Sequence, residues 1–136
     1  MARPVRRWVR VRGLTKEERA TTGARCDAFV ADVLTPQFLP VVVSTEWNYP
    51  ILLHGKWRAN RYSFIIRYRS GWGDNAGEES DSAWARLDHD EEFLTRDRFQ
   101  LMWRRHSGQW LPYRGPPTLD DALQAIETDP LMRPPL

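Results

Sequence analysis

The sequence predicts an α+β fold, a single domain in which a mostly antiparallel sheet of about five to six strands has an N-terminal and a C-terminal helix packed on one face. The clearest observation is a hairpin pattern over residues 98–113. Its first strand places Phe99, Leu101 and Trp103 at every second position, and Gly108 then allows the positive φ of a tight turn. Further strand-like segments precede the hairpin with short connections, and one amphipathic segment stands at each end.

Length and composition favour one cytoplasmic domain. The chain has 136 residues and one cysteine, Cys26, which excludes an intramolecular disulfide. It contains no apolar run near the roughly 20 residues that span a membrane. Its basic beginning lacks the apolar stretch of a signal peptide. We expect a domain over residues 14–130 and a frayed tail over residues 131–136, which contain Pro134-Pro135.

Charge is divided unevenly along the chain. Residues 1–13 carry a net charge of +5, and the remaining chain, with 15 basic and 18 acidic residues, carries −3. We predict that this basic arm makes electrostatic contacts with phosphates or an acidic partner, and the alternative is a solvated, partly disordered leader. The arginines of the arm are Arg3, Arg6, Arg7, Arg10 and Arg12.

The first helix is expected to begin after Thr15, which has Glu18 at the capping-box spacing. Thr35-Pro36 is expected to end it, because a residue before proline is pushed out of the helical region. Cys26 lies on the stripe that faces the core and is interpreted as an inert thiol. The other residues of the stripe are Phe29, Val30 and Val33.

The segments that follow are rich in β-branched residues or alternate in polarity, so we expect strands there. Residues 48–50 are expected to form a turn and residues 70–82 a loop. Trp72 on that loop is interpreted either as a local anchor or as a binding residue. The strands before the hairpin are expected at 38–45, 51–57, 62–69 and 83–88. In the strand at 62–69, the core face is expected to carry Tyr62, Phe64, Ile66 and Tyr68.

The last helix is expected to follow Thr118 as N-cap, with Asp120 and Asp121 in its first turn, where the helix dipole favours negative charge. Asp129-Pro130 is expected to end it. Its buried stripe is expected to be Leu119, Ala122, Leu123 and Ile126.

No pattern of catalytic or metal-binding residues stands out. The three histidines are isolated, and the acidic segment 88–92 matches neither a zinc nor a calcium spacing, so we interpret it as a solvated turn. No serine lies in a nucleophile motif, and no dinucleotide or phosphate loop is present. We therefore predict no metal and no cofactor, and an enzyme with an unrecognised site remains an alternative.

Binding of an anionic partner is the favoured function. We hypothesise a basic rim that contacts it, and the alternative is surface arginines paired with the acids of residues 88–92. The rim consists of Arg67, Arg69, Arg104, Arg105 and His106. The leading interpretation is a non-enzymatic accessory module for an anionic protein. The alternative is a nucleic-acid-binding protein that uses the arm and a basic sheet with aromatic residues such as Tyr62 and Phe64. Homo-oligomerisation is left open.

Several strings resemble a bacterial family known as domain of unknown function 3024. The most specific is Arg105-His106-Ser107-Gly108-Gln109-Trp110, at the turn of the hairpin. The resemblance covers roughly residues 60–130, with a weaker match in the first helix, and the basic arm is not part of it. It implies an intact small α+β domain and assigns no catalytic residue. The string that contains this turn runs over residues 98–110, and the other strings lie at residues 64–71, 83–87, 118–123 and 126–127.

Overall fold

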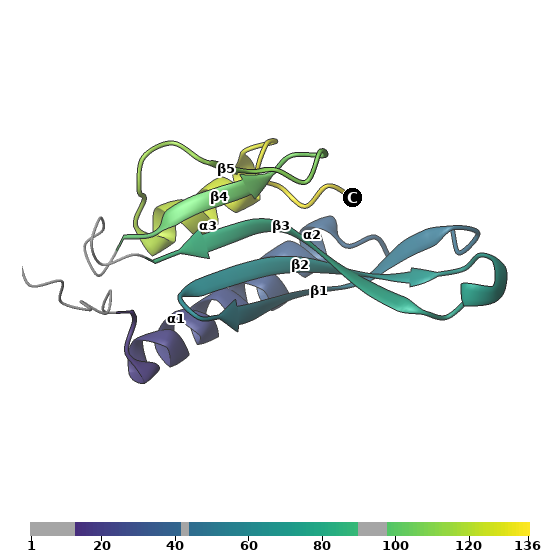
Figure 1. Ribbon diagram of the computed structural model, residues 1–136, viewed down its shortest axis with the longest axis horizontal. Coiled ribbons are helices and arrows are strands. Elements are labelled where there is room, and N and C mark those ends of the chain that lie inside the picture. The colour runs from purple at the N-terminus through teal and green to yellow at the C-terminus, as the bar shows by residue number, and fades with distance from the viewer. Residues whose placement is uncertain (1–12, 42–43, 90–97) are drawn as a thin grey trace, which may run out of the picture.

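The computed structural model describes residues 13–41, 44–89 and 98–136 (Figure 1). Within these residues, five strands form one sheet in which every neighbouring pair is antiparallel, and the spatial order follows the chain. The predicted α+β class and antiparallel sheet are therefore confirmed. The strands are β1 (Asn48–Arg58), β2 (Arg61–Ser70), β3 (Glu79–Asp88), β4 (Gln100–Arg104) and β5 (Trp110–Pro112).

Helices precede and follow the sheet, and Figure 1 shows them on the same side of it. The predicted capping box is present, because Glu18 N–H donates to Thr15 Oγ1 at 3.1 Å and Thr15 N–H donates to Glu18 Oε1 at 2.9 Å. The helical segments are α1 (Lys16–Phe29), a π-helical turn η1 (Val30–Leu34), α2 (Thr35–Phe38), a 3₁₀ turn η2 (Gly73–Asn75) and α3 (Leu119–Thr128).

The first helical segment was predicted to end at Thr35-Pro36. It continues instead through η1 and α2 to Phe38. In the wide turn of η1, the Thr35 N–H bonds to the Val30 carbonyl, five residues earlier, and the Thr35 hydroxyl donates to the same oxygen at 2.8 Å. Pro36 then occupies the first turn of α2, where a missing N–H costs least. The π turn thus lets a new α-helical turn begin at Thr35, with the proline in a position where it is tolerated.

Two predictions before β1 are wrong. Phe38 ends α2 and Val41 is fully exposed, so the described part of residues 38–45 contains no strand, and residues 42–43 lie outside the described chain. Residues 48–50 form the start of β1 rather than a turn. Pro50 is tolerated there because β1 is the edge of the sheet, where an N–H is not needed on the free side.

The hairpin of β1 and β2 confirms the predicted strands at 51–57 and 62–69 and extends both. A two-residue turn joins them, with Ala59 at a φ of 52°. Strand β3 begins at Glu79, inside the predicted loop, because its acidic residues pair across the sheet with arginines of β2. The connection between β2 and β3 is therefore shorter than expected.

The core lies between the sheet and the helices, and it confirms the predicted faces. Tyr62, Phe64 and Ile66 of β2 are each at most 1% exposed. The Tyr62 hydroxyl donates to the carboxylate of Asp27 on α1, which ties the helix to the sheet. The hairpin of β4 and β5 also matches its prediction, with Gly108 at a φ of 90° and a return strand over Trp110–Pro112. Buried residues of this hairpin and of the helices include Phe99, Leu101, Cys26, Phe29, Val30, Ala122, Leu123 and Ile126.

The C-terminal residues pack against the sheet. As predicted, Thr118 caps α3 by accepting from the Asp121 N–H at 3.2 Å. Within residues 131–136, which we expected to form a frayed tail, Met132 is fully buried and its carbonyl accepts from Trp84 Nε1 at 3.0 Å. None of the helices in the described ranges has the length and apolarity needed to cross a membrane.

Candidate functional site

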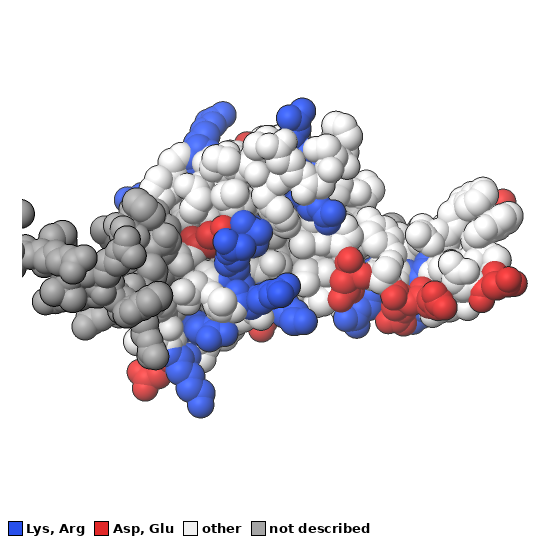
Figure 2. Space-filling view, in the orientation of Figure 1, with Lys and Arg blue, Asp and Glu red and all other residues white. Residues whose placement is uncertain are grey.

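The face of the sheet opposite α1 and α3, here called the open face, is the candidate site. Because Tyr62 and Phe64 point into the core, the alternate residues Ser63, Ile65 and Arg67 of β2 point to the open face. Figure 2 shows lysine and arginine side chains over the middle of this face. Acidic side chains gather toward the end that carries the connection between β2 and β3. The open face is therefore electrostatically divided along the strands.

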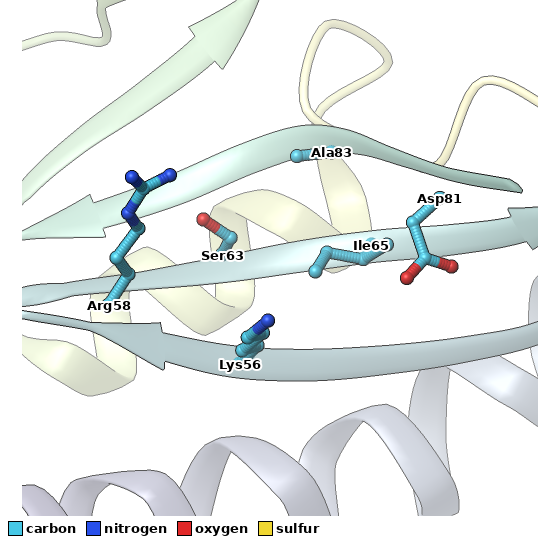
Figure 3. A pocket seen from close by; sticks show the side chains of 6 residues that line it. All are labelled: Lys56, Arg58, Ser63, Ile65, Asp81 and Ala83. Atoms are coloured by element: carbon cyan, nitrogen blue, oxygen red, sulfur yellow. The ribbon is translucent and has the colours of Figure 1, made fainter.

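A hollow of about 220 Å³ lies in the middle of the open face (Figure 3). The hollow forms because Ser63 on β2 and Ala83 on β3 have small side chains. Ile65, which is 8% exposed, supplies an apolar part of its lining. Lys56 and Arg58 border the hollow from β1, and neither forms an ion pair with a described residue. Asp81 completes the lining.

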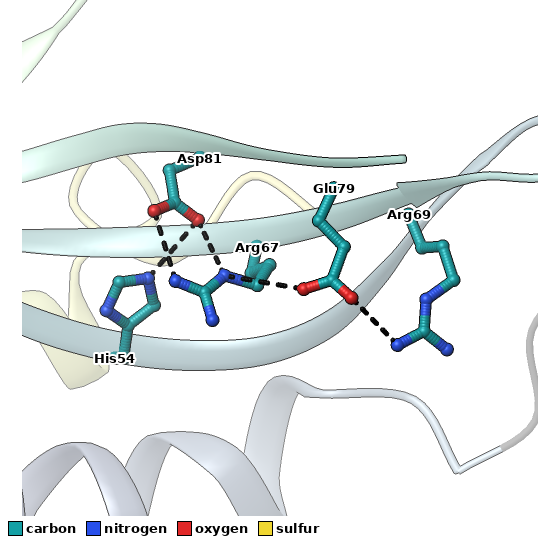
Figure 4. Close-up of polar contacts among 5 residues, drawn as sticks. All are labelled: His54, Arg67, Arg69, Glu79 and Asp81. Atoms are coloured by element: carbon teal, nitrogen blue, oxygen red, sulfur yellow. Dashed lines mark hydrogen bonds and ion pairs between the residues drawn. The ribbon is translucent and has the colours of Figure 1, made fainter. Parts of the chain in front are cut away.

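Asp81 is already held by two neighbours (Figure 4). Its carboxylate accepts from Arg67 Nε at 3.0 Å and Nη2 at 3.3 Å, and His54 Nε2 lies 3.3 Å from Oδ1. The hydrogen bonds from Arg67 lower the pKa of Asp81, partial burial opposes this, and His54 adds to it. The carboxylate therefore stays ionised near neutral pH, and its charge is balanced within the protein.

Two arginines of the predicted rim, Arg67 and Arg69, form ion pairs with acidic residues of β3. Arg67 also lies 4.0 Å from Glu79, and Arg69 Nη2 donates to Glu79 at 3.0 Å. Hydrogen bonding to Asp81 and Glu79 raises the pKa of Arg67 and of Arg69, respectively. The sequence reasoning weighed pairing with residues 88–92, whereas the carboxylates that pair with these arginines lie on β3.

The other rim residues lie at the tip of the hairpin between β4 and β5. Arg104, Arg105 and His106 are exposed, and none forms an ion pair with a described residue. Strand β3 separates them from Arg67 and Arg69 on β2. The structure thus splits the predicted rim into a balanced pair and an exposed group at the hairpin tip.

Lys56 and Arg58 are not among the residues of the predicted rim. The signal that identifies them is the register of the first hairpin, in which Lys56 pairs with Ser63 and Arg58 with Arg61. Directly opposed residues share a face, so the two cations stand beside the small residues of the hollow. That register requires knowing the turn at Ala59-Asn60.

A second basic group lies on the open face, where Arg86 of β3 pairs with Ser63 of β2. Arg86 donates to Asp88 through Nε at 2.6 Å and Nη2 at 2.8 Å, and its guanidinium lies 4.6 Å from the ring centroid of Trp110. Asp88 also lies 3.8 Å from Arg61. The ring of Trp110 lies at the open face and is covered by the guanidinium of Arg86.

Trp72, the other predicted binding residue, stands at the acidic end of the molecule. It is 61% exposed and stacks on Trp47, which is 57% exposed, with ring centroids 5.0 Å apart. The pair of rings agrees with the anchor interpretation, and the exposure leaves both rings accessible to a partner.

Other groups considered from the sequence do not form a reactive site. Cys26 is fully buried, and burial raises its pKa to about 12, which agrees with an inert thiol. Within the described ranges, no group of three or more histidine, cysteine or acidic residues is placed to hold a metal. We expected residues 88–92 to form a solvated turn. His89 is instead 3% exposed and packs against Phe99. The arginines of the arm, in residues 1–12, and the acids of residues 90–92 lie outside the described chain.

Comparison with known protein families places the chain in one of them. The sequence pattern of domain of unknown function 3024 (DUF3024) matches residues 14–133. The chain belongs to the DUF3024 family. The match begins at Leu14, so the basic arm precedes the DUF3024 domain, as expected, while the domain itself is longer than the resemblance indicated. Neither a curated protein nor a solved structure matches the chain.

Proposed function

We propose that this DUF3024 protein is a non-enzymatic binding module that holds an acidic segment of a protein partner on its open face. The observation that carries the proposal is the pair Lys56 and Arg58, two cations beside a hollow that have no counter-ion among the described residues. The carboxylates of the same face, Asp81 and Asp88, are already paired with arginines. An acidic segment supplies the missing negative charge.

An acidic protein segment is favoured over a nucleic acid because the aromatic residues expected to stack on bases are in the core. Tyr62, Phe64 and Phe99 are each at most 2% exposed. Trp110, at the open face, is covered by Arg86. Single-stranded nucleic acids are held by stacking as well as by phosphate contacts, and these rings do not provide that stacking.

The arrangement also favours binding over catalysis. Ser63 is the hydroxyl in the hollow, and its side chain forms no hydrogen bond with Lys56 or His54. A serine nucleophile is activated by such a bond to a base. His54 instead contacts Asp81, which Arg67 also holds. The buried thiol of Cys26 needs no oxidising compartment, which supports the cytoplasmic location that we infer.

The test is a titration of the full chain with a short glutamate-rich peptide and, separately, with an oligodeoxythymidine of similar length. Replacing Lys56→Glu together with Arg58→Glu is expected to weaken peptide binding by about tenfold or more, because two cations of the site change sign. The matched control is Lys16→Glu with Arg133→Glu, two exposed cations away from the open face. The control changes the net charge equally and leaves the arm intact.

Equal weakening by the site variant and by the control would reject the open face as the binding site. Tighter binding of the oligonucleotide, lost only in the site variant, would assign the same face to nucleic acid instead. Urea midpoints of both variants near that of the wild type would show that the fold is intact.

A further inference from the structure

A pair of exposed tryptophans at the end of the molecule is not explained by the core or by the open face. Trp47 and Trp72 are stacked and more than half exposed, whereas monomeric proteins rarely leave large aromatic rings together in water. Tryptophans in such positions are enriched among the residues that dominate the energy of protein interfaces. The pair therefore points to a contact with another molecule.

The two rings are held in place by the backbone beneath them. Gly71 N–H donates to the Trp47 carbonyl at 3.0 Å, which joins the segment before β1 to the β2–β3 connection. Gly71 is needed for this approach, because a Cβ there would overlap the carbonyl oxygen of Thr45. The Ser70 and Gly77 backbones are joined at 2.6 Å, which closes the connection. The tryptophans thus lie on a preorganised surface.

The charge around the tryptophans indicates the chemistry of the occupant. We define the acidic tip as residues 44–48 and 70–79, which contain four acidic residues and no lysine or arginine. Glu79 is paired with Arg69, and Glu46, Asp74 and Glu78 form no ion pair with a described residue. A segment rich in arginine complements this surface, since guanidinium groups pair with carboxylates and stack on indole rings. The protein itself uses that stacking between Arg86 and Trp110.

The chain carries such a segment in its basic arm. Residues 1–12 contain five arginines and no acidic residue. The arm leaves the domain at Gly13, which contacts Asn60 in the β1–β2 turn, at the end of the sheet opposite the acidic tip (Figure 1). The length of β1 alone separates the two ends by about 35 Å.

Covalent length decides which copy supplies the arm. Arg10 and Arg12 are at most three residues from Gly13, which limits their reach to about 11 Å, far less than the distance to the acidic tip of the same copy. Arg3, ten residues from Gly13, spans this distance only at full extension of about 36 Å. We propose that the acidic tip binds the basic arm of a second copy of the chain. The contact joins different surfaces of the two copies, so it is of the head-to-tail kind.

The test is the oligomeric state of the full chain by sedimentation velocity, at low salt and at about 0.5 M salt. The wild type is expected to self-associate at low salt and to dissociate at high salt. Asp74→Lys with Glu78→Lys changes the charge of the acidic tip from −4 to 0, and Arg6→Glu with Arg7→Glu changes the charge of the arm from +5 to +1. Each double variant is expected to weaken self-association by at least tenfold, because most of the electrostatic attraction between tip and arm is lost.

In a mixture of the two double variants, the unchanged arm of the tip variant meets the unchanged tip of the arm variant, so the mixture is expected to associate where neither variant does alone. Asp32→Lys with Glu127→Lys, which changes the net charge as much as the tip variant does, is expected to behave as the wild type. A monomeric wild type at low salt, or self-association that survives in the tip variant, would overturn the proposal. Loss of association in the tip variant but not in the arm variant would reject the arm as the occupant. Because Lys56 and Arg58 are unchanged throughout, failure here leaves the proposal for the open face standing.

Discussion

Replacing Gly55 with alanine is expected to loosen the seat of α1 on the sheet. Gly55 lies on β1 opposite Phe64, and a Cβ there would overlap the hydroxyl and ring of Tyr62. Tyr62 cannot move aside easily, because it is 1% exposed and packs edge-on against Trp57 and Phe64. Any displacement also disturbs its hydrogen bond to Asp27 on α1.

The cost follows from three contributions. Overpacking a filled core costs about 1–3 kcal/mol. Loss of a hydrogen bond to a charged group costs about 1.5–3 kcal/mol. The lower flexibility of alanine in the unfolded chain returns about 0.4–1 kcal/mol. We therefore expect Gly55→Ala to lower the free energy of unfolding by about 3 kcal/mol.

Urea denaturation measures this change as a lower midpoint with an unchanged slope. Gly115→Ala is the matched control, because a Cβ at Gly115 meets nothing within 4 Å, and we expect its effect to stay within about 0.5 kcal/mol. Combining Gly55→Ala with Tyr62→Phe should cost less than the sum of the two changes, since both remove the bond to Asp27. A loss below about 1 kcal/mol for Gly55→Ala would refute the account of this contact.

Three further predictions concern the tail, the open face and the thiol. Trp84→Phe removes the donor to the Met132 carbonyl, so we expect a loss of about 1–2 kcal/mol in urea denaturation and faster proteolysis after α3. The pKa of Asp81 is lowered in the folded state, so its stabilisation is present above its unfolded value of 3.8 and is lost as the pH falls through the folded value. Asp81→Asn should therefore flatten the acid limb of stability against pH, and an unchanged limb would contradict the pairing with Arg67. Because burial raises the pKa of Cys26 to about 12, a thiol reagent should modify it only as fast as the native protein opens, whereas rapid modification without urea would contradict its burial.

The elements that the sequence predicted well are those with a local signal. Alternation marked β2 and the hairpin of β4 and β5, and side-chain caps marked the starts of α1 and α3. Two of the errors came from prolines that were interpreted as breakers. Pro36 is tolerated because it falls in the first turn of α2, and Pro50 because β1 is an edge strand. Whether a proline is tolerated at either position cannot be predicted before the π turn and the strand order are known.

The candidate site was harder to predict because it depends on which residues stand opposite each other. Arg104, Arg105 and His106 are consecutive in the sequence, and the hypothesis of a basic rim was based on this local cluster. It does not show that Glu79 and Asp81 belong to a strand, because their segment is rich in acidic and serine residues and has low β propensity. Once β3 includes them, they balance the arginines of β2 and leave the cations of β1 without partners.

The central claim is that an acidic segment binds at the hollow bordered by Lys56 and Arg58. The most direct measurement is amide NMR of the full chain during titration with a glutamate-rich peptide. The account predicts that the shifts concentrate on β1, β2 and β3 around Lys56, Ser63 and Ala83, with a single salt-sensitive affinity. Shifts confined to residues 1–13, or spread evenly over every exposed cation, would contradict it.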